Sequence, residues 1–150
     1  MTDGCEWIVD ARGCDPARVA DLATLRALFA SIIEELCLSP VADAVWHVFP
    51  PPAGITGIVA LAESHLAVHT FPEHGSICLN LFCCKPRAEW PWVERLREHL
   101  GATHVAVRRL DRYYATEPGC EYHQSMPSAT QSPTASILPY ALGPGPSALD

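Results

Sequence analysis

Hydrophobic residues recur with two different periods along the first 110 residues of the chain. Short apolar or alternating runs bounded by Gly, Pro or polar residues are typical of β-strands. The predicted strands lie at residues 5–11, 41–49, 56–62, 65–70, 76–83 and 103–110. Between the first two, apolar side chains at helical spacing fill residues 19–36, and Asp15-Pro16 can begin a helix there. We therefore expect one long helix that starts at residue 16 and ends within residues 37–40.

A second helix is predicted at residues 92–100, where it is closed by Gly101. The Pro-rich residues 50–54 must connect two strands, because consecutive prolines cannot donate to a sheet ladder. The order is strand, helix, several strands, helix, strand. It predicts an α+β fold: a two-layer α/β sandwich in which two helices cover one face of a mainly antiparallel sheet.

Length and composition divide the chain into a folded part and a tail. A chain of 150 residues can build one modest core, so we expect a single domain at residues 1–114. Residues 115–150 hold six Pro, three Gly, eight Ser or Thr and no Lys or Arg. Such a segment cannot bury enough apolar surface to offset its ordering entropy, so we expect it to be largely disordered.

The formal net charge of -7 disfavours partners that carry many negative charges. No basic run offers the phosphate attraction that nucleic acids and anionic membranes require. No apolar run is long enough to cross a bilayer, and no cationic start leads into an apolar signal segment. We therefore expect a cytoplasmic protein that binds neither nucleic acid nor membrane and acts on a small soluble molecule.

The seven cysteines are odd in number, and most of them lie inside apolar patterns. Reduced thiols in the cytoplasm explain this distribution better than a disulfide framework does. No paired CxxC motifs are present, so we expect no metal site.

Chemically active side chains are concentrated in residues 63–84. Ser64 lies between Glu63 and His65, His69 follows, and Cys84 ends the next predicted strand. This places a nucleophile, proton carriers and thiols within the reach of one hairpin. Any one of them alone would be interpreted as a structural residue, but their joint spacing favours a functional role for Ser64, His69 and Cys84. Three neighbours keep a structural interpretation, namely Cys78, Asn80 and Cys83. For His65 both the structural and the functional interpretation stay open.

Residues 64 and 69 are separated by an odd number of positions. On a regular strand their side chains would point to opposite faces. We therefore predict an irregular backbone at Glu63-Ser64, where a turn or bulge would re-aim the serine.

These residues resemble the prokaryotic S-adenosylmethionine decarboxylases. The motifs are Glu63-Ser64-His65, then residues 69–73, then residues 82–84, supported by residues 13–15 and 54–57. Members of that family cut their own chain at a Glu-Ser bond and convert the serine into a pyruvoyl group. The resemblance implies cleavage between Glu63 and Ser64, a covalent pyruvoyl cofactor derived from Ser64, and a two-layer sandwich assembled as a homodimer.

The resemblance also assigns roles in the chemistry. Ser64 is the self-cleavage nucleophile, His69 helps to remove the Cα proton during processing, and Thr56 supports processing where the family commonly has Ser. Cys84 matches the thiol that returns a proton to the substrate after carbon dioxide leaves. The pyruvoyl ketone withdraws electrons from a condensed substrate amine, so neither pyridoxal phosphate nor metal is required.

Three further residues are implied in substrate binding. Glu73 matches a carboxylate that holds the ribose hydroxyls. Phe71 and Phe49 are candidates to stack on adenine or to face the sulfonium.

Residues at two positions leave the identity of the substrate undecided. Asn80 and Cys83 stand where the resemblance would lead us to expect Asp and Thr, and the loss of a negative charge could alter substrate choice. The main hypothesis is decarboxylation of S-adenosylmethionine for spermidine biosynthesis. The alternatives are a pyruvoyl-dependent decarboxylase of arginine or ornithine, and a catalytically silent homologue that acts as a binding protein.

Overall fold

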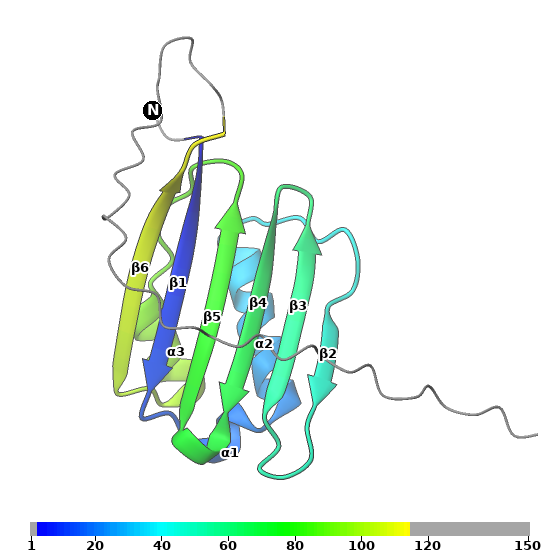
Figure 1. Cartoon of the computed structure of the whole chain (residues 1–150), viewed down its shortest axis with the longest axis vertical. Coiled ribbons are helices and arrows are strands. Elements are labelled where there is room, and N and C mark those ends of the chain that lie inside the picture. The colour runs from blue at the N-terminus through cyan, green and yellow to red at the C-terminus, as the bar shows by residue number, and fades with distance from the viewer. Residues whose placement is uncertain (1–2, 115–150) are drawn as a thin grey trace, which may run out of the picture. The chain divides into compact units, whose positions relative to one another are not determined.

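Six antiparallel strands form one sheet, and the helices lie on one side of it (Figure 1). The computed structural model describes residues 3–114, so the predicted tail at residues 115–150 lies outside the described part. The strand order in the sheet is β2-β3-β4-β5-β1-β6. In chain order the elements are β1 (Gly4–Arg12), α1 (Pro16–Val19), α2 (Leu22–Glu35), β2 (Val45–Val48), β3 (Ile55–Leu61), β4 (Ser64–Phe71), η1 (Pro72–His74), β5 (Ser76–Cys83), α3 (Trp92–Leu100) and β6 (His104–Arg112).

The predicted α+β sandwich is confirmed, but the prediction of one long first helix is wrong. It is split into α1 and α2, because two aspartates each begin a helix of their own. The Asp15 side chain accepts from the Ala17 N–H at 2.9 Å, and the Asp21 side chain accepts from the Thr24 N–H at 2.8 Å. Three helices rather than two therefore cover the sheet. None of the helices in residues 3–114 has the length and apolar character needed to span a membrane.

The second strand is shorter than predicted. Residues 41–44 are irregular, and only Val45–Val48 pairs with β3. The Val41 N–H instead donates to the Ala60 carbonyl at 3.1 Å, and Pro40 forms an isolated bridge with Leu61. This segment therefore lies across the end of β3 that leads into the β3–β4 turn.

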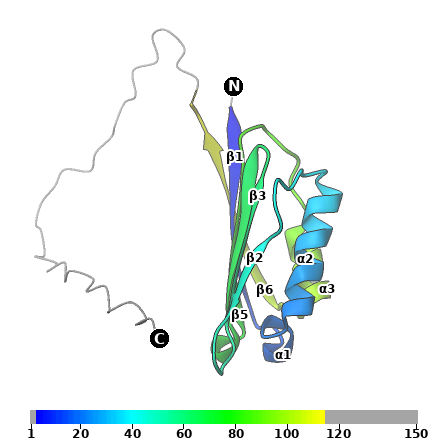
Figure 2. The same cartoon turned by 90° about the vertical axis from the view of Figure 1, so that its right-hand side faces the viewer.

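The two faces of the sheet have different surroundings. Figure 2 shows α2 and α3 packed against one face, while no described helix covers the other, which we call the open face. Along β4, Leu66 and Val68 are buried toward the helices, whereas His65 and His69 are exposed on the open face. The largest fully buried side chains are Trp7, Leu25, Leu28, Ile32, Ile55, Leu66, Ile77, Leu81, Trp90, Trp92, Leu96 and Leu100.

Truncation of Leu28 tests this core. Leu28 of α2 is fully buried, so Leu28→Ala should lower the free energy of unfolding by about 2 to 5 kcal/mol, through lost burial and a residual cavity. Urea unfolding measures the effect. The matched control Ala27→Gln, on the exposed side of the same helix, should change the stability by about 0.5 kcal/mol or less. Equal effects from the two substitutions would contradict the assigned helix face.

Candidate active site

A turn separates β3 from β4 one residue before the predicted irregularity at Glu63-Ser64, and Ser64 itself stands in the regular ladder of β4. Leu61 pairs with Ser64, and Ala62 and Glu63 form the turn between them. The Ala62 N–H donates to the Ser39 carbonyl at 2.8 Å. A tight turn therefore presents the peptide bond between Glu63 and Ser64 at one end of the sheet.

Both polar ends of Glu63 are bound by the segment that follows β5. Its carbonyl accepts from the Cys84 N–H at 2.9 Å. Its carboxylate forms an ion pair with Arg87, which also donates to the Leu36 carbonyl at 2.8 Å. The carbonyl that a neighbouring nucleophile would attack is thus fixed and polarised by a backbone N–H.

Ser64 is the first residue of β4 and pairs with Cys83 of β5. Its Oγ is buried and makes no hydrogen bond of regular geometry among residues 3–114, although it interacts with the neighbouring Cys83 thiol, whose pKa is raised by burial and lowered in smaller part by this contact. A buried hydroxyl without a good partner is costly, and such groups are uncommon in folded proteins. Ser64 therefore offers a weakly bound oxygen next to the fixed Glu63 carbonyl, which suits a serine that reacts with its own backbone.

His69 and Thr56 lie together at the other end of the open face. His69 Nδ1 and Thr56 Oγ1 are hydrogen-bonded at 3.0 Å across β3 and β4. His69 lies five positions along β4 from Ser64, which corresponds to roughly 17 Å along the strand. The turn does not re-aim the serine, and the two side chains project from opposite faces. One protomer therefore does not bring the nucleophile and this histidine together, contrary to the single-hairpin cluster expected from sequence.

The three predicted substrate-binding residues lie near the His69 end. The Phe49 ring contacts His47 edge-on with centroids 4.5 Å apart, Phe71 is 38% exposed, and Glu73 is exposed in η1. Of the three, only Phe71 lines a shallow hollow of about 350 Å³, whose other lining residues are Asp10, Ala11, Arg12, His74, Ser76, Ile77 and Cys78. Aromatic and acidic groups are thus available on this part of the protein for a cationic, ring-containing ligand.

The two adjacent cysteines have different environments. Cys83 is fully buried on the helix side, and burial is the main cause that raises its pKa to about 11. Cys84 lies just beyond β5 and is partly exposed. Its carbonyl accepts a hydrogen bond from the Tyr114 hydroxyl. Only Cys84 of this pair is therefore placed to exchange a proton with a bound molecule.

A chain of hydrogen bonds crosses the open face from His65. Its Nε2 is 3.0 Å from Asn80 Oδ1, and Asn80 Nδ2 donates to Glu6 at 2.7 Å. Glu6 in turn accepts from Arg112 at 2.6 Å. Asn80 thus bridges His65 and Glu6 on the open face, which is the side of the sheet opposite the Ser64 side chain.

Sequence reasoning missed Arg87 and Glu6. Arg87 lies in the irregular segment between β5 and α3, where no period constrains a side chain's neighbours. Glu6 lies on a predicted strand, but its partners are 74 and 106 residues away in sequence. No local signal in the sequence could have identified either contact.

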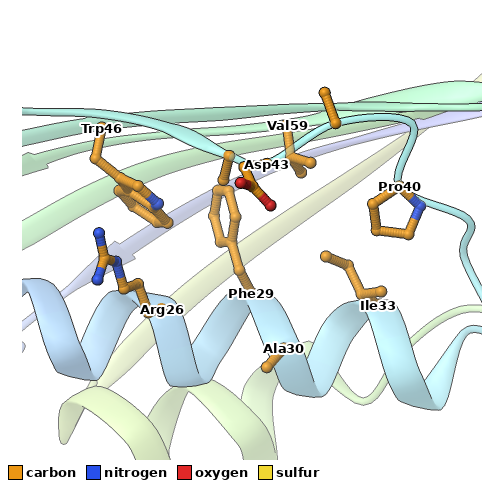
Figure 3. Close-up of a pocket in the computed structure, with 10 residues that line it drawn as sticks. Arg26, Phe29, Ala30, Ile33, Pro40, Asp43, Trp46 and Val59 are labelled. Carbon is orange, nitrogen blue, oxygen red and sulfur yellow. The ribbon is translucent and has the colours of Figure 1, made fainter.

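A cavity of about 510 Å³ lies away from all of these residues. Figure 3 shows the residues that line it, between α2 and the segment that precedes β2. Phe29 and Trp46 pack in it with ring centroids 4.7 Å apart, and Arg26 and Asp43 lie at its wall. None of the predicted site residues lines it.

Comparisons with known proteins identify the family. The family model described as S-adenosylmethionine decarboxylase matches residues 5–113. The chain belongs to the S-adenosylmethionine decarboxylase family. Among its relatives named S-adenosylmethionine decarboxylase proenzyme, the one from Pyrococcus furiosus is 32% identical over 112 residues, or 74% of this chain and 79% of that protein. The one from Acetivibrio thermocellus is 31% identical over 119 residues, which cover 77% and 92% of the two chains.

A solved structure supports the same fold for this member of the S-adenosylmethionine decarboxylase family. The crystal structure of adenosylmethionine decarboxylase from Aquifex aeolicus VF5 matches with a TM-score of 0.64. The match covers 77% of this chain and 95% of that chain at 23% identity. The two-layer arrangement is therefore the fold of a family relative.

Thiol alkylation tests the different environments of the cysteines. At pH 8 only about one Cys83 in a thousand should be ionised, because its pKa is about 11, and burial also blocks access. Treatment with iodoacetamide followed by peptide mass spectrometry should label the exposed Cys37 and the partly exposed Cys84 before Cys83. Cys83 should react only when the protein is unfolded. Labelling of Cys83 ahead of Cys84 in the folded protein would contradict this assignment.

Proposed function

We propose that this chain cleaves itself between Glu63 and Ser64 and then decarboxylates S-adenosylmethionine with a pyruvoyl group derived from Ser64. The observation that carries the proposal is the buried Ser64 Oγ, which makes no hydrogen bond of regular geometry among residues 3–114 and lies beside a Glu63 carbonyl that the Cys84 N–H already holds. The Glu-Ser pair also lies in the motif that resembles the family's cleavage site. Relatives that bear the name proenzyme support a step of this kind.

Self-cleavage uses groups of this chain. Ser64 Oγ attacks the Glu63 carbonyl carbon, and the C–N bond breaks as an ester C–O bond forms and the Ser64 nitrogen gains a proton. The Cys84 N–H stabilises the oxygen that becomes negative in this step. Removal of the Ser64 Cα proton then breaks the Cβ–O bond and expels the main-chain α-carboxylate of Glu63, which becomes the C-terminus of the first fragment. Addition of water and loss of ammonia leave a ketone at position 64.

The residues around position 64 suit such a group. The pyruvoyl ketone supplies an electron sink for the bond that loses carbon dioxide. The partly exposed Cys84 follows the strand residue that pairs with Ser64, and its thiol can donate a proton to the substrate carbon. Glu73, Phe71 and Phe49 would bind the ribose, adenine and sulfonium of the substrate.

A homodimer is part of the proposal, because one protomer separates the Ser64 end from the His69 end. A two-fold axis perpendicular to the strands reverses their direction, so it places the His69 end of one protomer beside the Ser64 end of its partner. The open face also exposes Val45, Ile58, Phe71 and Leu110, which a second protomer would cover. In this arrangement His69 of the partner subunit helps to remove the Cα proton during processing, and Thr56 of the partner subunit, hydrogen-bonded to that histidine, supports the step. The cytoplasmic location and the lack of nucleic-acid or membrane partners stay predictions from the sequence.

Intact mass and carbon dioxide release test the activity. The wild-type protein should appear as two fragments, residues 1–63 and 64–150, and should release carbon dioxide from carboxyl-labelled S-adenosylmethionine. Ser64→Ala should remain one chain of 16.3 kDa and release none, because the nucleophile is lost. Ser31→Ala on α2 is the matched control and should behave as wild type. Fragments that act only on arginine or ornithine would support the alternative decarboxylase, and an intact wild-type chain would support the silent homologue.

Complementation tests the shared site. Ser64→Ala and His69→Ala should each be uncleaved when expressed alone, since each lacks one of the two separated groups. When they are coexpressed, the His69→Ala chains in mixed dimers should be cleaved, because Ser64 then meets His69 of the partner subunit. Differently tagged chains and denaturing gels would show which chain is cut. Absence of cleavage in purified mixed dimers would contradict a site shared between protomers.

A further inference from the structure

Arg87 joins the cleavage turn to the end of a helix. Its Nη2 forms an ion pair with the Glu63 carboxylate, and its Nη1 donates to the Leu36 carbonyl at 2.8 Å. Leu36 is the C-cap of α2, where the helix dipole favours a cation. The Arg87 and Glu63 side chains are only 22% and 20% exposed. The ion pair is therefore partly withdrawn from water. In such surroundings two charges interact more strongly than on an open surface.

Arg87 and Cys84 act on the same residue from one short segment. The Cys84 N–H holds the Glu63 main-chain carbonyl, and Arg87, three positions later, holds the Glu63 carboxylate. Glu63 is thus fixed at both of its oxygen-bearing groups. A peptide bond held in this way keeps its carbonyl carbon in a constant position relative to Ser64, which favours attack within the chain.

The charge of Arg87 matters for the same step. When Ser64 Oγ attacks, negative charge develops on the Glu63 carbonyl oxygen, and the Glu63 carboxylate is an anion on the same residue. Without a cation, that carboxylate would oppose the developing charge. Arg87 neutralises the carboxylate and holds it in a fixed direction.

We propose that Arg87 is a positioning residue for self-cleavage, acting through the carboxylate of Glu63; this inference rests on the proposed function. This role differs from that of a purely structural contact between the end of α2 and the β3–β4 turn. A structural link would contribute to stability, but its loss would not be relieved by removing the charge of Glu63.

Pulse-chase measurement of cleavage after cell-free synthesis of the full chain tests the proposal. Arg87→Gln should cleave about tenfold to a hundredfold more slowly than wild type, the range expected when a charge-assisted contact is lost. The double variant Glu63→Gln with Arg87→Gln should cleave several-fold faster than Arg87→Gln alone, since the unpaired carboxylate is gone. Arg87→Lys keeps the charge but offers a point contact in place of the fork, so its rate should lie between wild type and Arg87→Gln.

Controls separate positioning from folding. Arg95→Gln is the matched control, because Arg95 also reaches α2 through an ion pair with Glu35 but lies away from the turn; it should cleave at the wild-type rate. Each Arg87 variant is also made with Ser64→Ala, and thermal unfolding of these uncleaved chains reports stability. If Arg87→Gln does not fold, the rate of Arg87→Lys carries the test.

Three results would overturn the positioning role. They are cleavage of Arg87→Gln or Arg87→Lys at the wild-type rate, a double variant no faster than Arg87→Gln, and an equal loss of rate in Arg95→Gln. A wild-type chain that stays intact would instead refute the proposed self-cleavage. The two failures are therefore distinguishable.

Discussion

The hydrogen bond from the Cys84 N–H to the Glu63 carbonyl is the contact on which the site depends. It follows from strand register: Ser64 pairs with Cys83, so the residue before Ser64 meets the residue after Cys83. Burial of the β4 and β5 side chains against the helices maintains that register, because a slip of one residue would turn every buried side chain toward the open face. Core packing and the geometry of the scissile carbonyl are thus parts of one arrangement.

The alternation of side chains on β4 imposes the second constraint. Ser64 lies on the buried side of the sheet at one end, and His69 lies on the open face at the other. No rotamer change can join two side chains separated by roughly 17 Å of strand. A site that uses both groups is not formed within one protomer, and the proposed homodimer would bring the His69 end of one protomer beside the Ser64 end of its partner by two-fold symmetry. The same proposed arrangement would cover the exposed apolar residues of the open face.

The sequence predicted most of the fold and named candidate reactive residues, but it did not predict how those residues are placed in space. The bounds Ser76–Cys83 and Trp92–Leu100 were predicted to the residue, because breakers flank clear periods there. The break between α1 and α2 was missed, since the apolar stripe continues past Asp21 and hides its role as a cap. The roles of Ser64, His69 and Cys84 stay predictions from motif spacing. Arg87 could not be found, because its contact with Glu63 spans an irregular segment.

Asn80 shows how a departure from the expected pattern can be accommodated. Its Oδ1 accepts a hydrogen bond from His65 Nε2 while its Nδ2 donates to the Glu6 carboxylate, and a side-chain amide can do both at once. An aspartate at this position would place a second carboxylate against Glu6, and one of the two would need a proton or a further cation. With the amide, Arg112 alone balances Glu6. The neutral side chain therefore changes the charge of the open face while leaving untouched the contacts that hold Glu63, so a change in substrate preference and retention of self-cleavage are physically compatible.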